Sequence, residues 1–68
     1  MSRYFFHFRD GAWRVDSDGQ ELTDVEAARL EACEIARQLA ESGEPASAAI
    51  VVSDGRQTLF EVGLGTVK

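Results

Sequence analysis

Residues 23–43 read TDVEAARLEACEIARQLAESG, and this stretch decides the fold because it is the longest segment with a helical period. Its composition is rich in Ala, Leu, Glu and Arg, which are all good helix formers. Thr23 and Glu26 fit a capping box at its start, and Gly43 favours its termination. We therefore predict a helix over about residues 23–42.

One face of this predicted helix is apolar and rich in alanine. At about 100° per residue, the apolar stripe contains Val25, Ala28, Ala32, Ile35, Ala36 and Leu39. Small side chains let a helix lie close to the surface that it covers, so we expect large side chains opposite this stripe. Leu30 projects from the polar face, where it is either a lone exposed leucine or a contact to a second chain.

The rest of the chain reads as short strands in two hairpins with Asp-Gly turns. We predict strands over about residues 3–9, 12–15, 47–53 and 57–63. The chain is then one domain, residues 1–68, with an α+β fold of two layers in the order β-β-α-β-β. One helix packs on a four-stranded, mainly antiparallel sheet, whose strand order the sequence leaves open.

Alternation along the first strand assigns a core face and an open face to the sheet. Tyr4, Phe6 and Phe8 point to the helix, whereas Phe5 and His7 point to the other side. The open face also presents apolar residues of the second hairpin beside polar groups. The interaction surface that we predict comprises Phe5, His7, Arg9, Trp13, Leu30, Val51 and Leu59.

The chain is short, and its composition lacks the usual means of stabilising a small domain. A domain of this size buries only about 60% of its unfolded surface. A single cysteine excludes an internal disulfide, and a single histidine excludes a His/Cys zinc cluster. Self-association is the remaining route, so we expect a homodimer, with an unidentified protein as a further partner.

The net charge of −5 disfavours binding to nucleic acid or to an anionic membrane. The charge is uneven, because residues 1–15 hold three arginines against one aspartate, a balance of +2. No apolar run approaches the length of a transmembrane helix, and the N-terminus lacks the apolar segment of a signal peptide. We expect a soluble cytoplasmic protein.

Two arrangements of residues invite a chemical interpretation. His7 and Cys33 have the residue types of a nucleophile pair. However, the histidine points away from the helix and the cysteine lies on the helix, so we expect the sheet to separate them. Asp16, Asp18 and Glu21 hint at a calcium loop, but the spacing of the glycine and the acids does not fit the full pattern. We interpret this segment as a solvated turn.

The first hairpin combines arginines with aromatic residues. Aromatic rings can stack on nucleic-acid bases, and arginines can neutralise phosphates. Arg3, Arg9 and Arg14 supply the charge. Against this function, most of the aromatic side chains are needed for the core. Only Phe5 and Trp13 remain for stacking.

Two segments of the sequence resemble a known family. Residues 3–11, RYFFHFRDG, and residues 18–24, DGQELTD, together with the alanines at 28 and 32, are similar to short bacterial proteins known only as a domain of unknown function. The resemblance runs from Arg3 to about Leu39, and the second hairpin matches more loosely. It implies a small standalone or appended α+β domain with no established activity, cofactor or catalytic residue.

The sequence therefore predicts a non-enzymatic interaction module that self-associates, with no catalytic residue, cofactor or metal. The alternative is a small nucleic-acid-associated regulator that uses the basic, aromatic first hairpin.

Overall fold

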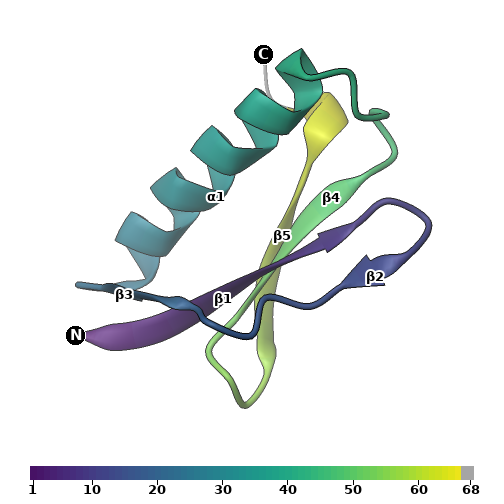
Figure 1. The fold of residues 1–68 in the computed structure, drawn as a ribbon. Coiled ribbons are helices and arrows are strands. Elements are labelled where there is room, and N and C mark those ends of the chain that lie inside the picture. The colour runs from purple at the N-terminus through teal and green to yellow at the C-terminus, as the bar shows by residue number, and fades with distance from the viewer. Residues whose placement is uncertain (67–68) are drawn as a thin grey trace.

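The computed structural model describes residues 1–66, so the predicted domain of residues 1–68 extends two residues beyond it. One helix lies across one face of an antiparallel sheet (Figure 1). This arrangement confirms the α+β fold. The elements in chain order are β1 (Ser2–Arg9), β2 (Trp13–Arg14), β3 (Gln20–Leu22), α1 (Val25–Glu41), β4 (Ala49–Ser53), β5 (Thr58–Gly63) and the 3₁₀ turn η1 (Leu64–Thr66).

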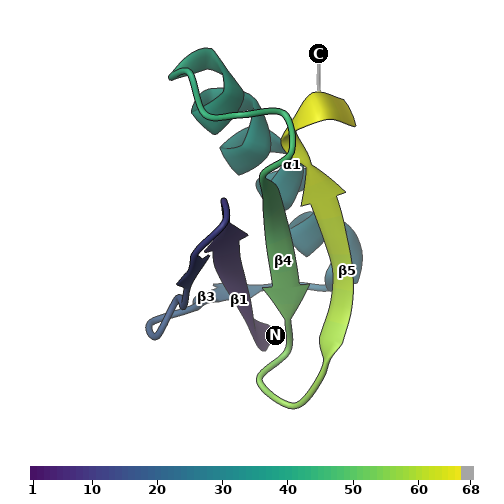
Figure 2. The ribbon, with the colours of Figure 1, turned by 90° about the vertical axis from the view of Figure 1, so that its right-hand side faces the viewer.

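The sheet has the order β2-β1-β4-β5, and β3 also pairs with β1. The first strand and the fourth strand therefore form the centre of the sheet, although about 40 residues of chain separate them. Figure 2 shows β4 beside β5, with the helix behind the sheet. The two predicted hairpins are both present, and they are joined through the β1–β4 pairing.

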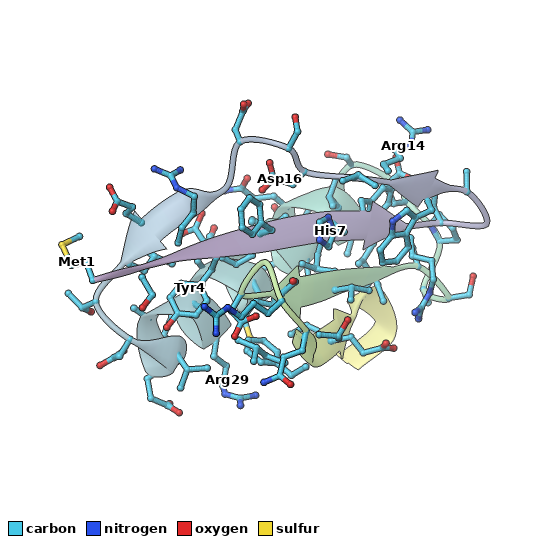
Figure 3. The ribbon with its side chains drawn as sticks, turned by 90° about the horizontal axis from the view of Figure 1, so that it is seen from below. Met1, Tyr4, His7, Arg14, Asp16 and Arg29 are labelled. Atoms are coloured by element: carbon cyan, nitrogen blue, oxygen red, sulfur yellow. The ribbon has the colours of Figure 1, made fainter. Side chains whose placement is uncertain are left out.

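The segment before the helix is a strand, which the sequence did not indicate. β3 pairs with the first residues of β1, from Ser2 opposite Leu22 to Tyr4 opposite Gln20. β2 pairs with the other end of β1 and is only two residues long, shorter than the predicted strand at 12–15. β2 and β3 follow the same edge of β1, and the chain between them leaves the ladder (Figure 3). Within residues 1–66, the sheet therefore has five strands and not four.

The N-cap of the helix lies one residue later than predicted. Asp24 is the N-cap, because its Oδ1 accepts a hydrogen bond from the amide of Ala27 at 2.9 Å. The predicted capping box of Thr23 and Glu26 is therefore wrong. The helix ends in a Schellman motif, in which the amide of Glu44 donates to the carbonyl of Leu39.

The core lies between the alanine stripe and the aromatic strand. Ala28, Ala32 and Ala36 are fully buried, and Tyr4 is the most buried aromatic side chain of β1. Phe6 and Phe8 pack against the same cluster, which confirms the predicted core face. Val25 does not belong to the core, because it is 39% exposed at the first turn of α1. The largest fully buried side chains are Ile50, Leu64 and Val52.

Candidate functional site

The face of the sheet away from the helix carries three rings in a line, which we call the aromatic row: Phe5, His7 and Trp13. Phe5 and His7 are two residues apart on β1, and their rings are stacked with centroids 6.4 Å apart. Trp13 on β2 is the next ring, with its centroid 5.3 Å from that of His7 and its plane tilted by 35°. Trp13 is 52% exposed, so the aromatic row ends in a large ring that solvent reaches.

Phe5 is held at the inner end of the aromatic row by two glycines. A Cβ atom at Gly19 would lie 2.8 Å from Cε2 of Phe5, and a Cβ atom at Gly55 would lie 3.2 Å from Cε1. The two glycines belong to different turns, one before β3 and one between β4 and β5. Phe5 is half-buried between them, so it is not the exposed residue that the sequence suggested.

His7 accepts a hydrogen bond from the loop that follows β2. The amide of Asp16 donates to Nδ1 of His7 at 3.0 Å. An imidazole nitrogen that accepts a hydrogen bond carries no proton, so the neutral ring holds its proton on Nε2. In Figure 3, His7 lies on β1 and Asp16 lies on the adjacent loop.

The carboxylate of Asp16 fixes this loop. Its Oδ2 accepts from the amide of Phe6 at 3.1 Å, which ties the loop to β1. Its Oδ1 accepts from the amides of Asp18 and Gly19, both at 3.1 Å. Partial burial raises the pKa of Asp16, but the hydrogen bonds from these three amides outweigh it, and a positive charge on His7 lowers it further. The net effect lowers the pKa of Asp16 below its ordinary value.

The predicted solvated turn is thus a hydrogen-bonded loop. Both oxygens of Asp16 are occupied by backbone amides, and Glu21 lies 3.7 Å from Arg3. Within residues 1–66, no group of three His, Cys, Asp or Glu side chains is arranged to hold a metal ion.

Arg9 and Glu61 form an ion pair across the central strand. The Arg9 guanidinium donates to both carboxylate oxygens of Glu61, at 2.9 and 3.2 Å. This hydrogen bonding and the positive charge of Arg9 lower the pKa of Glu61. In the register, Ala49 is opposite Arg9 and Val51 is opposite Glu61, so the pair spans β4. Val51 is only 3% exposed, which makes its predicted place on an exposed surface wrong.

The structure also separates two leucines from the predicted surface. Leu59 lies at an irregularity where Ser53 is opposite Thr58 and Val52 is opposite Phe60. The extra residue packs against the core cluster, so its predicted place on the open face is wrong. Leu30 is 73% exposed on α1, the helix that covers the other face of the sheet.

The structure does not bring His7 and Cys33 together. Cys33 lies on α1, which covers one face of the sheet. The His7 ring lies on the opposite face, in contact with Phe5 and Trp13. The sheet separates the two side chains, as the alternation along β1 predicts.

Each arginine of the first hairpin lies beside a carboxylate. Arg3 is 3.7 Å from Glu21, and Arg9 is 2.9 Å from Glu61. Arg14 is 3.7 Å from Asp10. The positive balance of residues 1–15 is therefore offset in space by acids from within and beyond that segment.

Comparison with protein-family models finds one family that matches this chain. The model described as Domain of unknown function (DUF6894) matches residues 3–65. The chain belongs to this family. The match to DUF6894 includes the second hairpin as well as the first, and it assigns no activity. No curated protein and no solved structure matched the DUF6894 chain.

The helix of this DUF6894 domain does not meet the requirements for a membrane span. Within the described part of the chain, residues 1–66, no helix has both the length and the apolar character that crossing a membrane requires.

Proposed function

We propose that this domain is a small non-enzymatic protein-interaction module that self-associates through the aromatic row. The observation that carries the proposal is Trp13, a large ring that is 52% exposed on the face of the sheet opposite the helix. We expect the protein to act in the cytoplasm, where a single free cysteine such as Cys33 stays reduced.

Trp13 has the properties of an interface anchor. Its ring is supported on one side by His7, which is itself stacked on the wedged ring of Phe5. A ring held in this way loses little conformational entropy when a partner covers it. Tryptophan side chains are enriched among the residues that contribute most to binding because they bury a large apolar area.

The small size of the hydrophobic core supports the proposal that the aromatic row serves self-association. The helix contributes only alanines to the fully buried set, and the phenylalanines of β1 and β5 are only partly buried. A chain of 68 residues with such a core gains stability from any further apolar area that it buries.

The charges of the open face also favour a second copy. The chain has a net charge of −5, so two copies repel each other on average. On the open face, however, Arg9 is paired with Glu61, and Arg3 lies beside Glu21. Two copies that meet through this face therefore bring together a charge-balanced part of their surfaces.

Sedimentation equilibrium over a range from low to high micromolar concentration tests the proposal. We expect a concentration-dependent mass that approaches twice the 7.5 kDa of the chain. Trp13→Ala should weaken the dimer by roughly thirtyfold, since truncating an anchor costs about 2 kcal/mol. Leu30→Ala is the matched control, because it removes an exposed apolar side chain from the helix and should leave the dimer intact.

Two results would contradict this proposal. A 7.5 kDa mass at every concentration would exclude self-association. A dimer that dissociates in Leu30→Ala but not in Trp13→Ala would place the contact on the helix and not on the aromatic row.

The alternative function, nucleic-acid association, has less support from the geometry. Trp13 offers a ring on which a base can stack. The arginines that would neutralise phosphate are each beside a carboxylate, so binding would have to break those pairs. A salt-dependent change in Trp13 fluorescence on addition of single-stranded oligonucleotide would favour this alternative over self-association.

A further inference from the structure

We propose that His7 is a pH-sensitive latch that closes the Asp16–Gly19 loop on β1 when the imidazole is neutral and releases it when the imidazole is protonated. The basis is the hydrogen bond from the Asp16 amide to Nδ1 of His7, at 3.0 Å. Neutral imidazole accepts this bond. Imidazolium carries a proton on both nitrogens and cannot accept it, so protonation sets two N–H donors against each other.

The latch acts at the point where the chain leaves the ladder between β2 and β3. Two hydrogen bonds tie Asp16 to β1, one from its amide to His7 and one from the Phe6 amide to its carboxylate. The same carboxylate holds the amides of Asp18 and Gly19. Loss of the bond to His7 therefore leaves Asp16 attached to β1 through one carboxylate oxygen, while Asp18 stays tied to β1 by the hydrogen bond from Arg3 to its carbonyl, at 2.8 Å.

The carboxylate of Asp16 is the charged group that couples to His7. Asp16 faces the ring from the loop, and its lowered pKa keeps it ionised over the range in which an imidazole titrates. Imidazolium is attracted to this carboxylate, and a new bond between them would draw the carboxylate from the Phe6 amide. On the sheet, Arg9 of β1 and Glu61 of β5 are paired with each other.

Within residues 1–66, the ring partners and the strand partner of His7 carry no charge. Phe5 and Trp13 contact its ring, and Val51 of β4 is its partner in the register. The helix lies on the other side of the sheet. Asp16 is therefore the ionised group that responds to the protonation of His7.

The latch is connected to both ends of the aromatic row. Gly19, in the loop, contacts the ring of Phe5, and His7 contacts Trp13. Release of the loop removes the glycine wall from Phe5 and changes the surroundings of Trp13. The open face thus has one form when His7 is neutral and a looser form when it is protonated.

Amide NMR of the full chain between about pH 8 and about pH 5, the range in which imidazole changes charge, tests the latch. We expect the Asp16 amide resonance to shift with the same midpoint as the His7 ring resonances. Hydrogen exchange at this amide, after correction for intrinsic rates, should become about two- to tenfold faster in the acidic form, as the loss of one hydrogen bond implies.

Two variants separate the latch from general effects of pH. His7→Asn places an amide oxygen near the position of Nδ1, so it accepts from the Asp16 amide but does not titrate. The Asp16 resonance should then be independent of pH in this range. His7→Phe keeps a ring between Phe5 and Trp13 but lacks an acceptor, so at pH 8 it should show the fast exchange of the acidic form.

Two outcomes would overturn the latch. One is a His7 ring that titrates while the Asp16 amide moves no more than it does in His7→Asn. The other is His7→Phe with a slow, wild-type rate of exchange at Asp16. The loop is observed directly, so neither outcome depends on whether the domain self-associates.

Discussion

At the scale of single residues, Gly19 and Gly55 matter because of the space that their missing side chains leave. The ring of Phe5 fills that space and comes within van der Waals contact of two turns that are far apart in the sequence. Gly19 also has a φ of +72°, which is a conformation that residues with a Cβ atom adopt at a cost. Its position therefore excludes other residues for two independent reasons.

We expect Gly19→Ala to destabilise the protein more than Gly11→Ala does. Gly11 also has a positive φ, +101°, but an added Cβ there meets nothing within 4 Å. Gly11→Ala should lower the free energy of unfolding only by the cost of placing alanine at a positive φ, about 1 kcal/mol. Gly19→Ala adds an overlap with Phe5 and should cost about 2–4 kcal/mol in all. Urea unfolding followed by Trp13 fluorescence gives both values, and equal losses would show that the contact with Phe5 is unimportant.

Asp16 shows what the sequence could and could not predict at this scale. The Asp-Ser-Asp-Gly spacing of residues 16–19 is typical of a turn in which the first side chain accepts from following amides, and it does so. The bonds to Phe6 and His7 could not be predicted, because they join residues nine and ten positions apart across an irregular part of the ladder. The sequence pattern therefore predicts the turn itself, but the spacing of residues does not predict the contacts of Asp16 with β1.

At the scale of elements, the alanine stripe of α1 was the most predictable feature. Its period identified the buried residues Ala28, Ala32 and Ala36, and the alternation of β1 identified the facing side of the sheet. The exact start of the helix was less predictable because Thr23 and Asp24 are both capping residues. Aspartate is the better N-cap of the two, and the structure uses it.

We expect Asp24→Ala to lower the free energy of unfolding by about 1 kcal/mol, because the Ala27 amide loses its acceptor. Thr23→Ala is the control, and it should change stability by less than about 0.5 kcal/mol, as for an exposed residue without such a role. Thermal unfolding followed by circular dichroism measures both. A larger loss in Thr23→Ala would show that the cap is Thr23 and would contradict the observed geometry.

Strand irregularities explain the errors on the open face. Simple alternation along β5 places Leu59 beside Glu61, but the shift in register between Val52 and Ser53 inserts one residue and turns Leu59 to the core. Val51 shares the face of its register partners His7 and Glu61, yet it is buried between them. Period alone describes which way a side chain points, and not whether neighbouring strands bury it.

At the scale of the whole molecule, charge is redistributed by the fold. The sequence shows a basic first hairpin and an acidic remainder, which raised the nucleic-acid alternative. In three dimensions, Arg9 meets Glu61, a residue 52 positions later in the chain. The fold class followed from the order of the elements, whereas this pairing depends on the strand order, which local turn signals do not determine.

The β2-β1-β4-β5 order also has a consequence for how fast the chain folds. Each hairpin joins strands that are neighbours in sequence. Pairing Arg9 with Ala49, however, closes a loop of about 40 residues, and this step is slow because closing a long loop costs conformational entropy. We expect Val52→Ala, in the β1–β4 pairing, to slow refolding. Leu64→Ala, in the turn after β5, should mainly accelerate unfolding. Stopped-flow measurements of refolding and unfolding rates distinguish the two effects. If Val52→Ala mainly accelerated unfolding and Leu64→Ala slowed refolding, the β1–β4 pairing would not be formed in the folding transition state.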